Sequence, residues 1–322
     1  MVELNGKKIL VTFLMHLGDL TLTTPFIHAL RKAAPDAHIT MLVDEKLKDV
    51  VLFNPYLDEV VTIDKKGRDN SILSLWACSR HLSKLDFDVL INLHPNERCS
   101  FIDAMTSVKL RTGTTHKIFK WFWDVFTPLD RSMHAADMYL DVLQQLGVQD
   151  LSNNGLEIFP GEEHFLEAEL FWQEQNITDQ DKLIGFNIGS AVPTKRWPPE
   201  RFAEVADIFA AKGYKTVFFG GPMDEEMVAE ATGYMQTRPI IATGHFAIGG
   251  LAAAMRRCCL IITNDSGPMH VAISQKVPIV AMYGPSNPKL YGPYTKDAVI
   301  VTAQPPCQGC ADGMKHSCDD LQ

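Results

Sequence analysis

The chain has no excess of positive charge, no long apolar run and few cysteines along most of its length. Lysine and arginine total 30 residues against 39 aspartates and glutamates, so the formal net charge is -9 at pH 7. A general nucleic-acid binder needs clustered basic residues for its phosphate contacts, and this charge balance disfavours that class. No apolar stretch approaches the ~20 residues that cross a bilayer, so we expect no transmembrane helix.

The N-terminus also lacks the features of a secretory signal. It runs directly into a predicted strand, without an apolar segment followed by a small-residue cleavage site. The 7 cysteines are an odd number, and most of them lack the spacing of a disulfide framework. Both features predict a cytoplasmic protein.

What the sequence does contain is enough apolar material for two cores. Hydrophobic residues make up 46% of the 322 residues and charged residues 21%, as in ordinary globular proteins. A single core stops growing at roughly 250 to 300 residues, so two domains are expected. Residues 149–161 are rich in Asp, Ser, Asn, Gly and Pro, which predicts a connection there and domains at 1–155 and 156–322.

Strands and helices are predicted to alternate in both halves, because short apolar runs alternate with segments of helical spacing. In the first half we expect strands at 7–14, 38–43, 59–63 and 87–93, and helices at 20–33, 46–53 and 72–85. In the second half we expect strands at 183–188, 216–219, 240–242, 260–263, 279–282 and 298–301, and the clearest helix at 199–212. This order is typical of an α/β fold with parallel sheets in two Rossmann-like domains.

Two turns between a strand and a helix carry residue types that suit ligand sites. The first turn ends in Gly18 and Asp19, and the second contains Asp265, Ser266 and Gly267. Ligands of open α/β sheets gather beyond the carboxyl ends of strands, so these turns are expected to be half-sites facing a cleft between the domains. Asp19 suits a general base, but helix capping explains it equally well, and capping also explains the second turn.

A third turn suits a phosphate. Gly189 and Ser190 follow a predicted strand, and Lys195 lies just before a predicted helix. Backbone N–H groups, a hydroxyl and an ammonium near a helix N-terminus can receive a diphosphate, although a plain turn with a surface lysine is an equal alternative. Asp224 and Glu225 follow another strand and could accept hydrogen bonds from a ribose diol, or simply begin a solvated helix.

As an ordered set these motifs are specific. The set consists of Gly18-Asp19, Gly189-Ser190, Lys195-Arg196-Trp197-Pro198, Asn264-Asp265-Ser266-Gly267-Pro268-Met269-His270 and Tyr283-Gly284-Pro285. Together these motifs resemble the ADP-heptose:lipopolysaccharide heptosyltransferase family over nearly the whole chain. The resemblance implies a GT-B glycosyltransferase with an acceptor-binding N-terminal domain and a nucleotide-sugar-binding C-terminal domain. It also implies cofactor-free, metal-independent transfer of heptose from ADP-heptose onto the lipopolysaccharide inner core, with inversion.

The resemblance further implies a role for each matching residue. Asp19 becomes the general base that deprotonates the acceptor hydroxyl, while Lys195 stabilises the departing ADP. The other donor-binding residues are expected to be Gly18, Gly189, Ser190, Asp224, Glu225, Asp265, Ser266, Gly267, Pro268, Met269 and His270. Among these, Gly267, Pro268 and Met269 are expected to offer backbone donors and Asp265 to hold sugar hydroxyls, whereas His270 could equally be a packed core residue.

Residues 109–134 form a basic stretch within the acidic chain. Their positive residues outnumber Asp124 and Asp130 and are Lys109, Arg111, Lys117, Lys120 and Arg131. Together with the aromatic run 118–123, this stretch could meet an anionic, lipid-linked acceptor at the inner face of the cytoplasmic membrane, with Arg111, Lys117 and Lys120 as acceptor contacts. The alternative is a core helix whose lysines extend to solvent.

The end of the chain offers four possible soft ligands for a metal ion, namely Cys307, Cys310, His316 and Cys318. Their spacing fits no standard zinc finger, so we expect reduced thiols and no bound metal. Other functions remain open at this point: a glycosyltransferase using another nucleotide hexose, a sugar-nucleotide epimerase or hydrolase on the same fold, and a non-catalytic nucleotide-sugar-binding protein.

Overall fold

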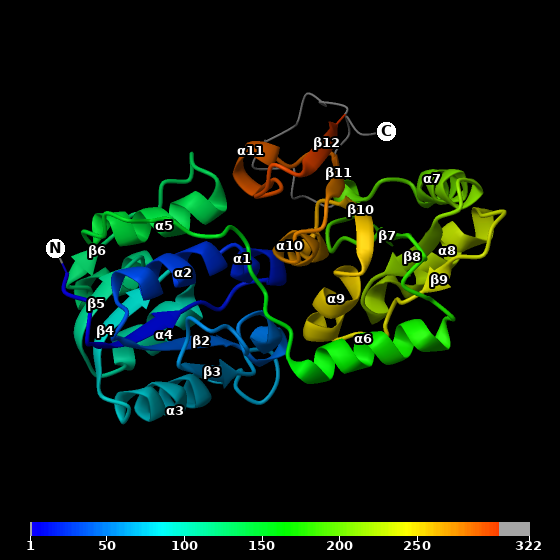
Figure 1. The fold of residues 1–322 in the computed structure, drawn as a ribbon. Helices are drawn as coiled ribbons and strands as arrows, with labels where there is room; N and C mark the ends of the chain where they lie inside the picture. Colours follow the sequence, from blue (N-terminus) through cyan, green and yellow to red (C-terminus); the bar gives the residue numbers. More distant parts are fainter. Residues whose placement is uncertain (1, 303–322) are drawn as a thin grey trace. The chain divides into compact units, whose positions relative to one another are not determined.

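A computed structural model describes residues 2–302 of the chain. The chain separates into two compact units, and the division falls between Gly155 and Leu156. Each unit is built around one parallel sheet with helices on both faces (Figure 1).

The sheet of the first unit has six parallel strands in the order β3-β2-β1-β4-β5-β6. The strands are β1 (Lys8–Thr12), β2 (His38–Asp44), β3 (Glu59–Ile63), β4 (Phe87–Asn92), β5 (Val108–Gly113) and β6 (Val125–Phe126). Ile9, Leu10 and Val11 of β1 are fully buried, because a central strand of a covered sheet loses both faces to the core.

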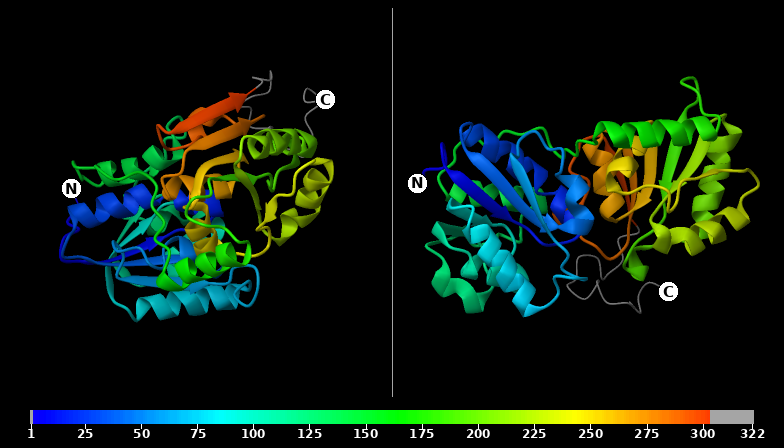
Figure 2. Two further views of the ribbon diagram at one scale, coloured as in Figure 1. Left: turned by 45° about the vertical axis from the view of Figure 1, so that its right-hand side comes forward. Right: turned by 90° about the horizontal axis from the view of Figure 1, so that it is seen from below.

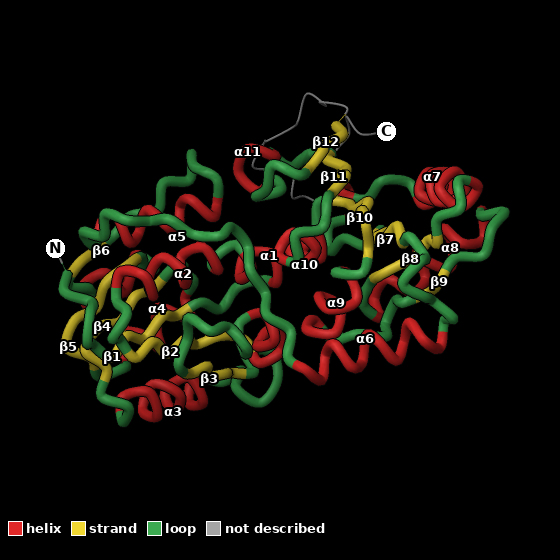
Figure 3. The backbone as a smooth tube through the Cα atoms, viewed as in Figure 1, coloured by secondary structure: helices red, strands yellow, loops and turns green. Residues whose placement is uncertain are grey.

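Helices cover both faces of this sheet (Figures 1 and 3). They are α1 (Leu17–Thr21), α2 (Thr24–Ala33), η1 (Glu45–Val50), α3 (Ile72–Ser83), α4 (Glu97–Met105), η2 (Lys117–Phe122) and α5 (Ala135–Gln145). Helices α2 and α5 pack together on one face, and α3 and α4 pack together on the other.

The single helix predicted at residues 20–33 is in fact two helices. Pro25 lies in the first turn of α2 and has no N–H to donate to the carbonyl of Thr21. That carbonyl instead accepts the hydroxyl of Thr24, at 2.8 Å. The segment predicted as a helix at 46–53 also differs, since it forms the short 3₁₀ helix η1.

The second unit has six parallel strands in the order β12-β11-β10-β7-β8-β9. Figure 2 shows this unit in two further views, as the green-to-red part of the ribbon. The strands are β7 (Leu183–Asn187), β8 (Lys215–Phe219), β9 (Ile240–Ile241), β10 (Cys258–Asn264), β11 (Ile279–Tyr283) and β12 (Ala298–Thr302). The helices are α6 (Glu162–Glu174), η3 (Pro193–Lys195), α7 (Pro199–Ala211), η4 (Pro222–Asp224), α8 (Glu225–Tyr234), α9 (Ile248–Met255), α10 (Gly267–Ser274) and α11 (Pro288–Tyr291). Helix α7 packs with α8, and α9 packs with α6 and α10.

Candidate active site

The strand order of the second unit reverses next to β7. The chain builds outward from β7 through β8 to β9, and then returns to place β10 on the other side of β7. The turns that follow β7 and β10 are therefore neighbours, and ligands of open α/β sheets bind at such a reversal. Gly189 and Ser190 follow β7 and Asp265 follows β10, so the sequence-predicted donor residues meet at this place.

A mostly buried ion pair joins two of these residues. Lys195 Nζ lies 2.8 Å from Asp265 Oδ2, and the two side chains are 16% and 6% exposed. Lys195 is thus not the surface lysine of the alternative interpretation. Burial first, and the Asp265 carboxylate second, raise the pKa of the nearby Tyr283 hydroxyl well above its ordinary value. The ion pair with Asp265 therefore fixes the Lys195 ammonium at the position where an anionic ligand is expected.

Side-chain amides tie the turn after β10 to the loop that carries Lys195. Asn187 Nδ2 donates to Ser266 Oγ at 3.0 Å, and Asn264 Nδ2 donates to the carbonyl of Ile188 at 2.7 Å. Asn264 Oδ1 accepts the backbone N–H of Trp197 at 2.9 Å. These bonds fix the two turns against each other before any ligand arrives.

The start of α10 has no side-chain cap. Ser266 occupies the N-cap position without capping the helix, and Asp265 pairs with Lys195 instead. Ordinary capping, the alternative interpretation of this turn, is therefore wrong. Of the three residues expected to offer backbone donors, Pro268 has no N–H and Met269 donates its N–H to the carbonyl of Ser266 at 3.2 Å. Only the amide of Gly267 remains suitable among these three.

Gly189 lies directly against the side chain of Asp224. A Cβ added to Gly189 would lie 2.2 Å from Asp224 Oδ1. Asp224 Oδ2 also accepts the backbone N–H of Gly221 at 2.9 Å. The Asp224 carboxylate thus lies against the turn after β7 and bonds the turn after β8, and its expected contact with a ribose stays a prediction.

Glu225 differs from its neighbour Asp224. It is exposed, and it begins helix α8. It lines a shallow pocket of about 290 Å³, whose other lining residues are Val228, Ala229, Thr232, Ile241 and Thr243. Of the two acidic residues singled out in the sequence, Glu225 is therefore the one that reaches an open, partly apolar hollow.

The first unit has a comparable reversal between β1 and β4. Asp19 is the third residue of α1, which follows β1, and it is half-buried. The loop after β4 carries His94, whose pKa burial lowers to about 4, with smaller contributions from the charges of Arg131 and His16. The imidazole of His94 is thus neutral at pH 7, and it lies beside Phe13 with 6.0 Å between ring centroids.

His94 is not among the residues expected at the site from the sequence. Its only signal is its position directly after a strand, and that signal becomes informative once β4 is known to be the neighbour of β1. The ends of these two strands are also joined beneath the loops, because Asp103 accepts hydrogen bonds from Thr12 Oγ1 at 2.9 Å and from Asn92 Nδ2 at 2.5 Å. Burial raises the pKa of Asp103 to about 7.

Comparison with known proteins decides the family. The sequence pattern of glycosyltransferase family 9 (heptosyltransferase) matches residues 75–317. The chain belongs to this family. As a family 9 member it is a glycosyltransferase, and the expectations of a transferase and of an α/β GT-B fold class are confirmed.

Individual relatives agree with this assignment. The glycosyl transferase family 9 protein from Veillonella parvula DSM 2008 has a solved structure with 57% identity and a TM-score of 0.92, covering 94% of this chain and 88% of its own. Lipopolysaccharide heptosyltransferase 3 of Escherichia coli K12 is 24% identical over 88% of this chain and 84% of its own. The structure of E. coli ADP-heptose lps heptosyltransferase II is 23% identical, with a TM-score of 0.79 over 91% of this chain and 90% of its own, and shows the shared fold.

The three acceptor candidates of this family 9 enzyme have different environments. Arg111 lies on β5, where Nε donates to the carbonyl of Asp103 at 3.1 Å and Nη2 donates to the carbonyl of Thr106. Its guanidinium thus closes the C-terminal end of α4, which argues against its expected contact with an acceptor. Lys117 and Lys120 lie on η2 and are exposed.

The interpretation of residues 109–134 as a core helix is wrong. The segment forms β5, η2 and β6, and most side chains of η2 are exposed, while Phe119 is half-buried against Phe101. Trp121 is 93% exposed and Ile118 64%, whereas Trp123 is buried and donates its Nε1–H to the carbonyl of Thr112 at 3.1 Å. An anchored loop thus presents apolar and basic side chains at the surface.

Other expectations concern burial, metal ions and membranes. His270 is 4% exposed within α10, as the packed alternative for that residue predicts.

The metal candidates Cys307, Cys310, His316 and Cys318 lie outside the described residues. Within residues 2–302, no group of three or more His, Cys, Asp or Glu side chains could hold a metal ion. In the same part of the chain, no helix has the length and apolar character needed to span a membrane.

Proposed function

We propose that this family 9 glycosyltransferase moves heptose from ADP-heptose onto the lipopolysaccharide inner core, with inversion and without a metal ion. The observation that carries the proposal is the Lys195 ammonium, paired with Asp265 at the strand reversal of the second unit. Curated relatives named lipopolysaccharide heptosyltransferases 2 and 3 support the acceptor class. A solved relative, E. coli heptosyltransferase WaaC with ADP-2-deoxy-2-fluoro heptose, supports the donor class.

In this proposal residues 156–322 bind the nucleotide sugar. Lys195 and the hydroxyl of Ser190 meet the diphosphate, and the amide of Gly267 at the start of α10 adds a donor. These groups stabilise the negative charge that develops on departing ADP, which is the task that a metal ion performs in other enzymes. Asp265 then releases part of its contact with Lys195 and accepts hydrogen bonds from sugar hydroxyls.

Residues 1–155 bind the acceptor in this proposal, and Asp19 is the general base. A single displacement at the anomeric carbon needs one group that takes the proton of the attacking hydroxyl. The oxygen of that hydroxyl forms the new glycosidic bond as the bond to the ADP phosphate oxygen breaks. ADP leaves with the electron pair, and the configuration at the anomeric carbon is inverted.

The substrate assignment is tested by incubating the protein with an inner-core acceptor and either ADP-heptose or UDP-hexoses. We expect turnover with ADP-heptose and release of ADP, measured by mass spectrometry of the glycosylated acceptor. The rate should be unchanged when EDTA is added, because the charges on ADP are met by protein groups. Turnover only with a UDP-hexose would overturn the donor assignment, and consumption of the donor without an acceptor would favour an epimerase or hydrolase.

We also propose that η2 brings the enzyme to the cytoplasmic face of a membrane. Ile118 and Trp121 expose apolar area, and Lys117 and Lys120 supply positive charge on the same short helix. Lys120 Nζ lies 4.4 Å from the ring centre of Phe126, so the aromatic and basic groups are contiguous. Such a surface suits the headgroup region of an anionic bilayer, in which a lipid-linked acceptor is embedded.

Removing the two lysines of η2 is expected to weaken binding to anionic vesicles. Each lysine near an anionic surface contributes about 1 kcal/mol, so Lys117→Gln with Lys120→Gln should reduce partitioning roughly 30-fold. The measurement is sedimentation with vesicles of phosphatidylcholine and phosphatidylglycerol. A separate Ile118→Ser variant should also bind less, whereas Ile208→Ser, which alters an isoleucine of α7 that is 53% exposed, should bind normally. Equal vesicle binding by all variants would contradict the membrane proposal.

A further inference from the structure

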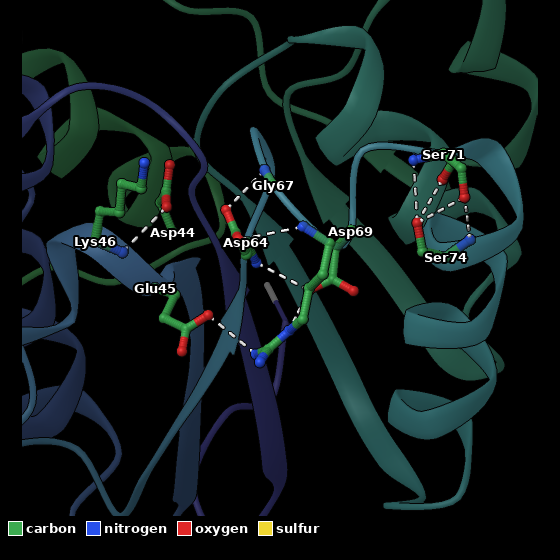
Figure 4. Close-up of polar contacts among 9 residues, drawn as sticks. Asp44, Glu45, Lys46, Asp64, Gly67, Asp69, Ser71 and Ser74 are labelled. Carbon is green, nitrogen blue, oxygen red and sulfur yellow. Dashed lines mark hydrogen bonds and ion pairs between the residues drawn. The ribbon is translucent and has the colours of Figure 1, made fainter.

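The ammonium of Lys65 contacts two backbone carbonyl groups and one carboxylate of the first unit. Lys65 Nζ donates to the carbonyl oxygens of Leu14 and Met15, each at 3.0 Å, and lies 3.1 Å from Asp44 Oδ2. An ammonium has three N–H donors, and these three acceptors account for them. The side chains of Lys65 and Asp44 are 13% and 7% exposed. Asp44 is itself fixed, since its Oδ1 accepts the N–H of Lys46 at 3.1 Å (Figure 4).

These contacts join the ends of three neighbouring strands. Strands β3, β2 and β1 are adjacent in the sheet, and Asp44 is the last residue of β2. Leu14 and Met15 lie just beyond Thr12, where β1 ends. From its position after β3, Lys65 therefore reaches across the end of β2 to the turn that enters α1.

The segment that carries Lys65 is held in place by its own hydrogen bonds. Asp69 Oδ2 accepts the N–H of Asp64 at 2.9 Å, and Asp64 Oδ1 accepts the N–H of Gly67 at 2.9 Å (Figure 4). A Cβ on Gly67 would lie 2.0 Å from Asp64 Oδ2, so the turn closes tightly around this carboxylate. Lys65 is thus anchored at its backbone as well as at its ammonium.

Other contacts at the turn before α1 are weaker than those of Lys65. Helix α1 has 5 residues, and its N-cap residue His16 makes no capping hydrogen bond. Asn96 Nδ2 reaches the carbonyl of Leu14 at 3.4 Å, a long contact. Lys65 therefore holds the peptides that directly precede α1, the helix whose first turn carries Asp19.

We propose that Lys65 is a positioning residue for Asp19. Its ammonium acts through the turn and does not contact either substrate. The inference rests on the proposed role of Asp19 as the general base. Displacing a reacting group by about 1 Å can cost about 10²-fold in rate, so loss of this support should be visible in kcat.

The test compares Lys65→Met with Lys66→Met, which alters the exposed neighbouring lysine. We expect Lys65→Met to lower kcat by about 10- to 10²-fold, without changing KM for the nucleotide sugar. Lys66→Met should behave like the wild type. Unchanged kcat in Lys65→Met would overturn the proposal, and so would a rise in donor KM without a fall in kcat.

A double variant separates positioning from stability. Lys65→Met alone leaves the Asp44 carboxylate buried without its cation, so the melting temperature should fall. Lys65→Met with Asp44→Asn removes both charges, and Asn can still accept the N–H of Lys46. We expect the double variant to regain thermal stability while kcat stays low. Recovery of kcat together with the melting temperature would show that Lys65 acts only through stability.

Hydrogen exchange tests the same inference independently of the chemistry. In Lys65→Met, the amides of residues 15–20 should exchange faster than in the wild type, and those of α5 should not. Unchanged exchange in residues 15–20 would overturn the inference even if activity fell. Failure of the base assignment would appear separately, as an active Asp19→Asn enzyme with Lys65 intact.

Discussion

Replacing Asp19 with Asn is expected to lower kcat for sugar transfer by about 10²- to 10⁴-fold, which is the contribution of a positioned general base. Asn has nearly the same shape as Asp but cannot take the proton of the acceptor hydroxyl. Because Asp19 lies in the unit that we propose binds the acceptor, ADP should still raise the melting temperature of the variant as it does for the wild type. Steady-state transfer assays and thermal shifts with ADP measure the two effects.

The matched control is Asp36→Asn, which changes an exposed aspartate just after α2 in the same unit. Asp36 Oδ2 accepts a hydrogen bond from Asn5 Nδ2, and an Asn side chain can still offer an oxygen there. This variant should retain wild-type kcat. Near wild-type kcat in Asp19→Asn would remove Asp19 from the chemistry, and a loss of the ADP response would show that the substitution disturbs more than a proton acceptor.

Much of the fold could be predicted because the apolar runs of the sequence are the segments whose side chains are buried in the structure. The strand predicted at residues 59–63 is β3 with the same bounds, and the helix predicted at 199–212 is α7 almost unchanged. No continuous apolar run marks β5 or β6, because Lys109 and Arg111 interrupt β5 and because β6 has only 2 residues. An edge strand such as β6 has little core to bury, and the sequence carries a correspondingly weak signal.

The site could be predicted in part, because turns with Gly, Ser, Asp and Lys after strands are visible in a sequence. Lys195 and Asp265 were both singled out, but their pairing depends on β7 and β10 being neighbours, which local patterns do not determine. The contacts of Lys65 could not be predicted for the same reason. A lysine after a strand resembles any surface lysine until the sheet order shows which strand ends lie next to it. Arg111 shows the converse error, because a basic residue in a basic stretch proved to bond the backbone of α4.

Replacing Lys195 with Met is expected to produce the largest loss in the second unit. The ammonium is the cation that we propose meets the diphosphate, and a hydrogen bond to a charged group is worth about 1.5 to 3 kcal/mol. ADP should therefore bind about 10- to 10²-fold more weakly, measured by titration calorimetry. The rate constant kcat should also fall by about 10²- to 10³-fold, because the charge on departing ADP grows in the transition state.

The same substitution also leaves the buried Asp265 carboxylate without its cation. Breaking a buried pair by removing one partner costs about 3 to 5 kcal/mol, so the melting temperature of Lys195→Met should fall clearly. Adding Asp265→Asn removes the uncompensated charge and should restore most of that stability. The double variant should still bind ADP weakly and transfer slowly, since neither side chain can then serve the diphosphate or the sugar.

The control for Lys195 is Lys212→Met, which removes an exposed ammonium just after α7 in the same unit. It should leave ADP binding and kcat unchanged, because a general loss of positive charge is not the proposed cause. If Lys195→Met loses stability but binds ADP and turns over like the wild type, Lys195 is a structural partner of Asp265 and the diphosphate must meet other donors. If instead Lys195→Met binds ADP weakly while Lys212→Met binds it normally, the loss is caused by removing the Lys195 ammonium. That ammonium lies at the reversal between β7 and β10, where ligands of open α/β sheets bind.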